Sequence, residues 1–169
     1  MSPNGKTPRF ASAFDALPAE RQRAWMAYIK VQLRLTYEMN RQLQADSDMS
    51  LADYDVLNAL RHAPDGTMRI GALAVRIGWE RSRVSHHVRR LERRGLVECR
   101  VSPSDRRATD VTLADTGLTL ITQASSGHVE LLERLFFDGL PQELTEPLTA
   151  ALEAIYANLL ERGTLPPPT

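Results

Sequence analysis

A basic segment near the middle of the chain carries the residue types best suited to bind an anion. Residues 82–94, SRVSHHVRRLERR, contain arginine, histidine and serine at intervals typical of one helix. At about 100° per residue, Val84, Val88 and Leu91 fall on one side of that helix. The strongest hydrogen-bond donors fall on the other side: Ser82, Arg83, His86, Arg89, Arg90 and Arg93. The segment therefore predicts an amphipathic helix that packs against a small core and turns its donors outward.

This segment is positively charged although the formal net charge of the whole chain is zero. Between residues 76 and 107 there are ten arginines and four acids, which gives a local charge of +6 and leaves −6 for the remainder. A merely solvated helix face usually mixes both signs, but Glu92 is the only acid from residue 82 to residue 94. Because charge of one sign repels itself unless an anion neutralises it, the segment favours a nucleic-acid partner over a solvated face.

Two short hydroxyl side chains, Ser82 and Ser85, stand near the start of the expected helix and are followed by arginine and histidine. This order suits the major groove of DNA, where the N-terminal residues of a recognition helix reach the base edges. Arginine can pair there with O6 and N7 of guanine. The basic side of the helix is therefore our candidate for contact with DNA.

Two runs of alternating residues follow this helix and predict a β-hairpin. Cys99 falls in the inward-facing register of the first run together with Val97 and Val101. The turn SPSDRR between the runs projects Arg106 and Arg107. A narrow minor groove attracts such arginines, and a solvated turn is the alternative. Asp105 could either cap the turn or brace an arginine.

Helices of different lengths must hold these two segments. Ser50 and Asp53 form an S-x-x-D capping pattern at the start of a short helix, and Gly78 ends another. A long helix is expected before them, and two more after the hairpin. The last of these carries a nearly continuous apolar stripe of Leu144, Leu148, Leu152, Ile155 and Leu159.

This order of elements predicts a mainly α fold with a small β-hairpin wing (α+β), in which a winged helix-turn-helix is flanked by long helices. The expected boundaries are a flexible tail at 1–17, a long helix at 18–47, the winged helix-turn-helix at 50–113, two long helices at 114–163 and a flexible tail at 164–169.

Bulk properties narrow the class of protein. The chain of 169 residues is 43% hydrophobic and 25% charged, as is ordinary for a globular protein. It has no apolar run near the ~20 residues that span a membrane and no apolar N-terminal leader, so we expect a cytoplasmic protein. Because it has one cysteine, we expect no disulfide within the chain. No nucleophile–base pair, Gly-rich phosphate loop or metal motif is visible. We therefore expect no enzyme activity and no cofactor.

The stretch MRIGALAVRIGWERSRVSHHVRRLERRGLVECRVSPSDRRATDVTLADTG, residues 68–117, resembles the winged-helix core of MarR-type transcriptional regulators. The similarity lies in a helix followed by RLERRGLV, in the D-x-R pair Asp105 and Arg107, and in a closing V-x-L-T-x-x-G pattern that here is Val111, Leu113 and Gly117. The flanking helices agree with the family layout, so the resemblance extends over about 18–162.

The resemblance implies a symmetric homodimer, in which the first and last two helices of each subunit interleave and one winged helix binds each DNA half-site. It implies that Arg107 enters the minor groove. The recognition-helix residues expected to contact bases or phosphates are Ser82, Arg83, Ser85, His86, Arg89 and Arg90, and those of the wing are Asp105, Arg106 and Arg107. Small anionic aromatic effectors often act on such proteins, which predicts a repressor under effector control.

Three positions depart from the family pattern. Glu80 stands where a Ser or Thr usually caps the recognition helix, so either Glu80 caps it or the helix begins at Ser82. Ala114 replaces the threonine that ends the wing motif, which leaves Asp115 or Thr112 to cap the next helix. Arg89 stands at a position that is often acidic and would strengthen phosphate contact.

Several other residues could support different chemistry. Cys99 could sense oxidants, but family members that do so place the cysteine in the first helix, and a buried structural thiol is more common. The four histidines, His62, His86, His87 and His128, lack the paired spacing of a zinc site, so no metal is expected. Trp25, Tyr28 and Tyr37 could line an effector pocket, but aromatic residues at helical spacing more often form a dimer core. A winged helix used for protein–protein contact is the alternative function.

Overall fold

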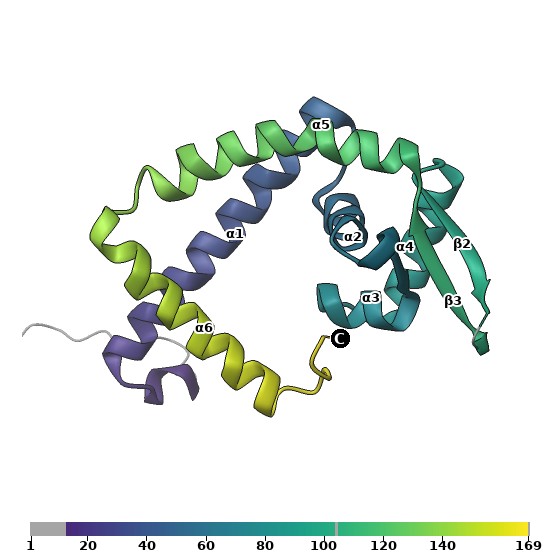
Figure 1. Cartoon of the computed structure of the whole chain (residues 1–169). Helices are drawn as coiled ribbons and strands as arrows, with labels where there is room; N and C mark the ends of the chain where they lie inside the picture. The colour runs from purple at the N-terminus through teal and green to yellow at the C-terminus, as the bar shows by residue number, and fades with distance from the viewer. Residues whose placement is uncertain (1–12, 104, 169) are drawn as a thin grey trace, which may run out of the picture. The chain divides into compact units, whose positions relative to one another are not determined.

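The computed structural model describes residues 13–103 and 105–168 of the chain (Figure 1). Its helices and strands are a 3-10 turn at Ala13–Ala16, α1 (Ala19–Ser47), α2 (Leu51–Arg61), a 3-10 turn at Pro64–Gly66, β1 (Thr67–Arg69), α3 (Ile70–Ile77), α4 (Arg81–Arg93), β2 (Val97–Ser102), β3 (Asp105–Leu113), α5 (Asp115–Leu132), a π-helical turn at Glu133–Phe137, a 3-10 turn at Gln142–Leu144 and α6 (Thr145–Arg162). No helix within the described residues is long and apolar enough to cross a membrane.

The chain divides into two compact units, residues 1–37 and 38–169. The first unit holds most of α1, and the second holds the end of α1 and every later element. Most of the predicted N-terminal tail lies outside the described residues, but Ala13–Ala16 form a helical turn. The last described residues, 164–168, belong to no helix or strand.

The mainly helical fold with a small wing is confirmed, and its core lies around the helix-turn-helix. Val84, Val88 and Leu91, the predicted apolar side of α4, are all fully buried. They pack in one cluster with buried residues of α2, α3 and α5, among them Leu57 and Leu73. The basic side of α4 is therefore turned away from this core.

The predicted capping box at the start of α2 is present. The Ser50 hydroxyl accepts a hydrogen bond from the backbone N of Asp53 at 3.1 Å, and the Asp53 carboxylate accepts one from the backbone N of Ser50 at 3.0 Å. Glu80 occupies the N-cap position of α4 and Ala114 that of α5, but neither makes a side-chain cap hydrogen bond. Thr112 instead pairs its hydroxyl with that of Thr67 at 2.9 Å.

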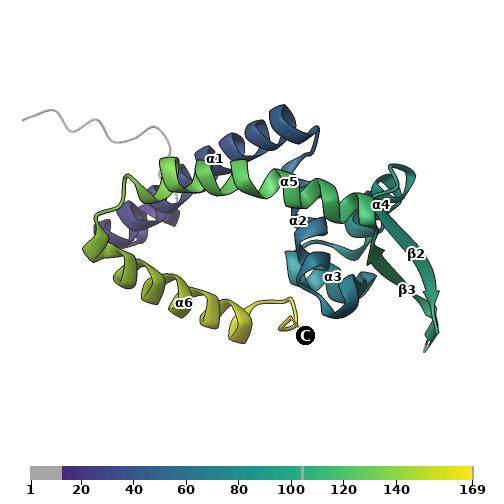
Figure 2. The same ribbon diagram turned by 45° about the horizontal axis from the view of Figure 1, so that its top comes forward.

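The wing is a three-stranded antiparallel sheet of order β1-β3-β2, where the sequence predicted only a hairpin. The short strand β1 was missed because three residues are too few to show alternation. Figure 2 shows β2 and β3 extending away from α3 and α4. Because the tip of the hairpin projects beyond the core, Val101 is 65% exposed, and the prediction that it faces inward was wrong.

The first turn of α5 packs closely on the loop that follows α4. The backbone N of Ala114 donates to the carbonyl oxygen of Leu96 at 3.1 Å, and the Thr116 hydroxyl donates to the carbonyl oxygen of Gly95. A Cβ added at Gly117 would overlap the carbonyl oxygen of Leu96 and approach Leu113 Cδ1 to 2.9 Å. The glycine that closes the sequence motif therefore permits this close approach.

Candidate nucleic-acid interface

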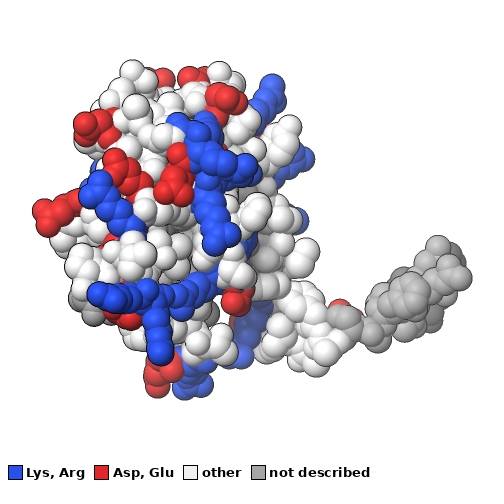
Figure 3. All heavy atoms as spheres, turned by 90° about the vertical axis from the view of Figure 1, so that its right-hand side faces the viewer, with Lys and Arg blue, Asp and Glu red and all other residues white. Residues whose placement is uncertain are grey.

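The outer side of α4 presents its polar residues to solvent. Five of the six predicted contact residues on this helix are exposed: Ser82, Arg83, His86, Arg89 and Arg90. Figure 3 looks onto the side of the molecule that carries the wing and shows arginine or lysine side chains standing out there, with acidic side chains among them. The structure thus brings the predicted residues of the recognition helix onto one accessible face.

The sixth residue, Ser85, is half-buried. Its hydroxyl donates to the carbonyl oxygen of Arg81 one turn earlier, at 2.9 Å. A hydroxyl has a single proton to donate, so Ser85 can offer an external partner only its acceptor lone pairs. Ser85 therefore stays a predicted contact residue, with its hydroxyl as an acceptor in this conformation.

The wing residues Asp105, Arg106 and Arg107 are exposed near the end of the hairpin. The Asp105 carboxylate accepts a hydrogen bond from the backbone N of Arg107 at 3.0 Å, so it caps the turn. This contact holds the backbone of the turn. Ser104, the residue before Asp105, lies outside the described residues.

A buried carboxylate ties α2 to α4. Asp53 is 2% exposed, and its Oδ1 accepts a hydrogen bond from Arg90 Nη2 at 3.2 Å and lies 2.8 Å from Nε2 of His87. Its Oδ2 accepts from Arg94 Nη1 at 3.1 Å. The sequence revealed Asp53 only as a helix cap, because its arginine partners lie 37 and 41 positions away.

These contacts govern the ionisation of Asp53. Burial alone would raise its pKa, but hydrogen bonds from His87, Ser50 and Arg90 outweigh that effect and hold the pKa well below its ordinary value. The carboxylate is therefore charged at neutral pH and pairs with the arginines. Arg90 was predicted to point outward toward DNA, but one of its guanidinium nitrogens donates to the buried Asp53 carboxylate. The prediction for Arg90 is corrected to this extent.

The two neighbouring histidines of α4 have different surroundings. His86 is exposed, whereas His87 is 9% exposed and packs its ring edge-on against Trp79, with 5.3 Å between the ring centroids. His128, on α5, is also buried and lies against Tyr54, and burial lowers its pKa. Among residues 13–103 and 105–168, no three His, Cys, Asp or Glu side chains gather closely enough to hold a metal ion.

A stacked pair stands at the start of α4. The guanidinium carbon of Arg83 lies 3.9 Å from the centroid of the Trp79 ring, a cation–π geometry. Trp79 belongs to the turn between α3 and α4 and packs against the buried core. Nothing in the helical periodicity pointed to this pair, because Trp79 precedes the helix.

Cys99 on β2 is poorly suited to redox chemistry. It is partly buried, and its backbone N donates to the Glu92 carboxylate at 3.1 Å. Burial first, and the nearby Glu92 carboxylate second, raise the pKa of the thiol to about 11. The thiol is therefore protonated at neutral pH and is a weak nucleophile.

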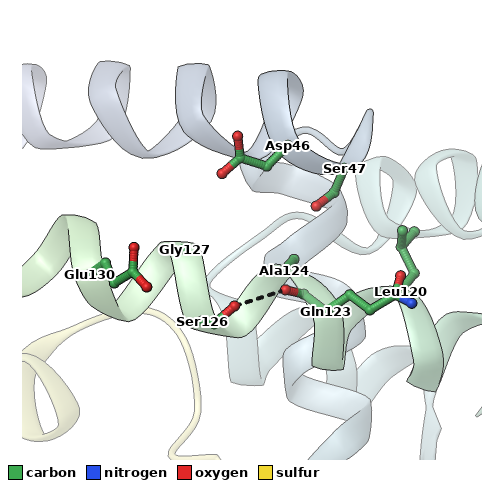
Figure 4. Close-up of a pocket in the computed structure, with 8 residues that line it drawn as sticks. All are labelled: Asp46, Ser47, Leu120, Gln123, Ala124, Ser126, Gly127 and Glu130. Atoms are coloured by element: carbon green, nitrogen blue, oxygen red, sulfur yellow. Dashed lines mark hydrogen bonds between the residues drawn. The ribbon is translucent and has the colours of Figure 1, made fainter.

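A polar hollow of about 340 Å³ lies between the end of α1 and α5 (Figure 4). Asp46 and Ser47 line it from α1, and six residues line it from α5: Leu120, Gln123, Ala124, Ser126, Gly127 and Glu130. These eight residues include two carboxylates and no basic side chain. The hollow therefore has the wrong charge for an anionic ligand.

Comparison with known proteins decides the family. Residues 47–108 match the model of the MarR family. The HTH-type transcriptional repressor IacR of Pseudomonas putida is 30% identical over 135 residues, which cover 80% of this chain and 77% of IacR. This chain belongs to the MarR family. It is a DNA-binding transcriptional regulator of that family, whose members are not enzymes.

Solved MarR structures agree with this assignment. Sco3205, a MarR regulator from Streptomyces coelicolor crystallised in complex with DNA, is 33% identical, has a TM-score of 0.82, and is matched over 89% of this chain and 97% of Sco3205. The organohalide-sensing regulator RdhR, solved with bound 2,4-dichlorophenol, has a TM-score of 0.76 and is 18% identical, over 95% of this chain and 94% of RdhR. At that identity, the likeness to RdhR shows the fold alone.

Proposed function

We propose that this MarR regulator is a repressor that binds a pseudo-palindromic operator in double-stranded DNA as a homodimer. The observation that carries the proposal is the exposed arginine-rich face of α4, next to a wing that presents Arg106 and Arg107. Sco3205, a relative with 33% identity, was crystallised with DNA, and IacR is a repressor. A DNA partner also supports the expected cytoplasmic location.

Large apolar side chains on two helices support the homodimer. On α1, Trp25, Tyr28, Val31, Leu33 and Tyr37 are each about half exposed or more. On α6, Leu152, Ile155, Tyr156 and Leu159 are 46–59% exposed. Apolar surface of this extent in a single chain favours a partner, and a second copy would bury the same residues by symmetry. A two-fold dimer would place its recognition helices about one turn of DNA, ~34 Å, apart.

The exposed residues take different roles in this proposal. Ser82, Arg83 and His86 lie toward the N-terminal end of α4 and would read base edges in the major groove. Arg89 lies further along the helix and would contact phosphate, while Arg107 would enter the minor groove. Arg90, held by Asp53, would orient α4 and contribute positive charge to the interface.

An effector remains part of the proposal. The family resemblance predicts a small anionic aromatic molecule, and RdhR, which shares the fold, binds 2,4-dichlorophenol. The polar hollow presents two carboxylates to such an anion, so it is a poor site for the effector. An effector would change repression only if it bound the DNA-competent and incompetent forms with different affinity.

The test is fluorescence anisotropy of the purified protein against duplex DNA from upstream of its own gene and against a scrambled duplex, at several salt concentrations. We expect selective binding with a steep salt dependence. Arg107→Ala should weaken binding to both duplexes and make it less dependent on salt, since a cation that would enter the minor groove is removed.

Arg134→Ala is the matched control, because it removes an exposed arginine that lies outside α4 and the wing. It should leave both affinity and salt slope unchanged. No DNA binding at low salt would instead favour the alternative of a winged helix that contacts proteins. Equal loss in the two variants would contradict the role of Arg107.

A further inference from the structure

The inference starts from the stack of Arg83 on Trp79. The guanidinium carbon lies 3.9 Å from the ring centroid, and Arg83 is the third residue of α4. A cation–π contact uses the flat face of the guanidinium group. The N–H donors lie in the plane of that group, so the stack does not use them and they can form a bidentate pair with O6 and N7 of guanine.

Other polar groups of α4 differ in this respect. The Ser85 proton is donated to a carbonyl oxygen of the same helix, and one guanidinium nitrogen of Arg90 is donated to Asp53. The described contact of Arg83 with Trp79 instead restricts the side chain without consuming a donor. Ordering an arginine side chain costs rotamer entropy, and the stack on Trp79 meets part of that cost before DNA binds.

Trp79 is in turn held from the protein interior. The ring of His87 meets the Trp79 ring edge-on, at an interplanar angle of 86°. His87 is itself buried, with its Nε2 at 2.8 Å from the Asp53 carboxylate. Contacts therefore run from a buried carboxylate through two rings to an exposed guanidinium group. A side chain supported in this way holds its geometry better than one supported by solvent.

We propose that Trp79 is a positioning residue that sets the base selectivity of the recognition helix, by holding Arg83 ready to read a guanine in each half-site. This inference rests on the proposed operator binding and deepens it. Phosphate contact would need no such support, since an arginine can approach a phosphate from many directions. Reading a base edge requires one orientation, which the stack supplies.

The experiment selects duplexes from a random pool with the full-length protein and compares the base preferences of variants. Arg83→Ala should lose its preference at one symmetric pair of positions in the enriched site. Trp79→Leu keeps apolar bulk but removes the ring face, and it should lose preference at the same pair. We expect its affinity for the wild-type site to fall on the order of tenfold. Trp79→Phe, which keeps an aromatic face, should retain part of the preference.

Ile77→Ala is the control for a merely structural effect, because Ile77 also packs against the core just before the turn that carries Trp79. It should reduce affinity evenly and leave the pattern of base preferences unchanged. Adding Trp79→Leu to Arg83→Ala should cause little further loss, since the tryptophan acts through the arginine.

Two results would overturn the inference. One is a Trp79→Leu variant that loses preference evenly at all positions, as Ile77→Ala does. The other is a double variant whose loss of affinity equals the sum of the losses, in free energy, of Trp79→Leu and Arg83→Ala. If the wild-type protein enriches no sequence at all, the proposed operator binding itself fails, and the inference falls with it.

Discussion

Two carboxylates on α2 show how position decides the effect of a charge. Asp53 is held ionised by hydrogen bonds from α4 that outweigh its burial. Burial raises the pKa of Asp55, two residues later, and the nearby His87 and Arg83 side chains only partly oppose that rise. We therefore expect the charge of Asp53 to stabilise the fold at neutral pH and the charge of Asp55 to destabilise it.

Asp53→Asn should lower the free energy of unfolding by about 2 kcal/mol at pH 7, because the charge-assisted hydrogen bonds to Arg90 and Arg94 are lost. The pKa of Asp53 is lower in the folded state, so its stabilisation is complete above the ordinary carboxyl range and is lost as the pH falls below about 4. Urea unfolding at several pH values measures this, and we expect the gap between wild type and variant to narrow in acid. A gap that stays constant down to pH 3 would contradict this assignment.

Asp55→Asn is the matched substitution and should act in the opposite direction. A raised pKa in the folded state means that stability is lost as the pH rises through it, so removing the charge should increase the free energy of unfolding at neutral pH. Below the ordinary carboxyl range the substitution should have little effect, because the wild-type carboxyl is then protonated in both states. The same urea titrations measure it, and destabilisation at pH 7 would show that the Asp55 charge is needed by the fold.

At the scale of elements, the sequence predicted most of the helix-turn-helix because its signals are local. The capping box of Ser50 and Asp53 and the apolar side of α4 depend on residues a few positions apart, and both are confirmed. Strand β1 could not be predicted in this way, since it exists through pairing with β3 across more than 40 residues. The orientation of Arg90 was missed for the same reason, because a helical wheel does not show which carboxylate lies opposite.

The junction between α4 and α5 explains a glycine that the sequence marked only as part of a motif. Gly117 lies in the first turn of α5, where an added Cβ would overlap the Leu96 carbonyl oxygen. A backbone atom cannot rotate away, so Gly117→Ala should force α5 to shift and lower the free energy of unfolding by about 2 kcal/mol.

Gly71→Ala is the control, because Gly71 is also helical but has open space where its Cβ would lie. That substitution should stabilise the protein by about 0.5–1 kcal/mol through higher helix propensity. Denaturant unfolding of the two variants checks both expectations. Equal stability changes at the two sites would mean that the loop after α4 yields to α5 and that Gly117 has no packing role.

At the scale of the whole molecule, the proposed homodimer makes operator binding depend on residues that do not touch DNA. Ile155 and Leu159 on α6 are 58% and 59% exposed in the single chain. Ile155→Glu would bury a charge in the proposed dimer interface, a cost that the dimer cannot offset without a partner cation. We expect a monomer by light scattering coupled to gel filtration. Binding to a full operator should fall much more than binding to one half-site, because a monomer loses the second linked contact.

Ala157→Glu is the matched control, since it adds the same charge to α6 on the side away from the apolar stripe. It should remain dimeric and bind DNA as the wild type does. A monomeric Ile155→Glu that still binds the full operator with wild-type affinity would show that the two winged helices act independently. A dimeric Ile155→Glu would move the interface away from α6, and the exposed aromatic side chains of α1 would then be the surface to substitute next.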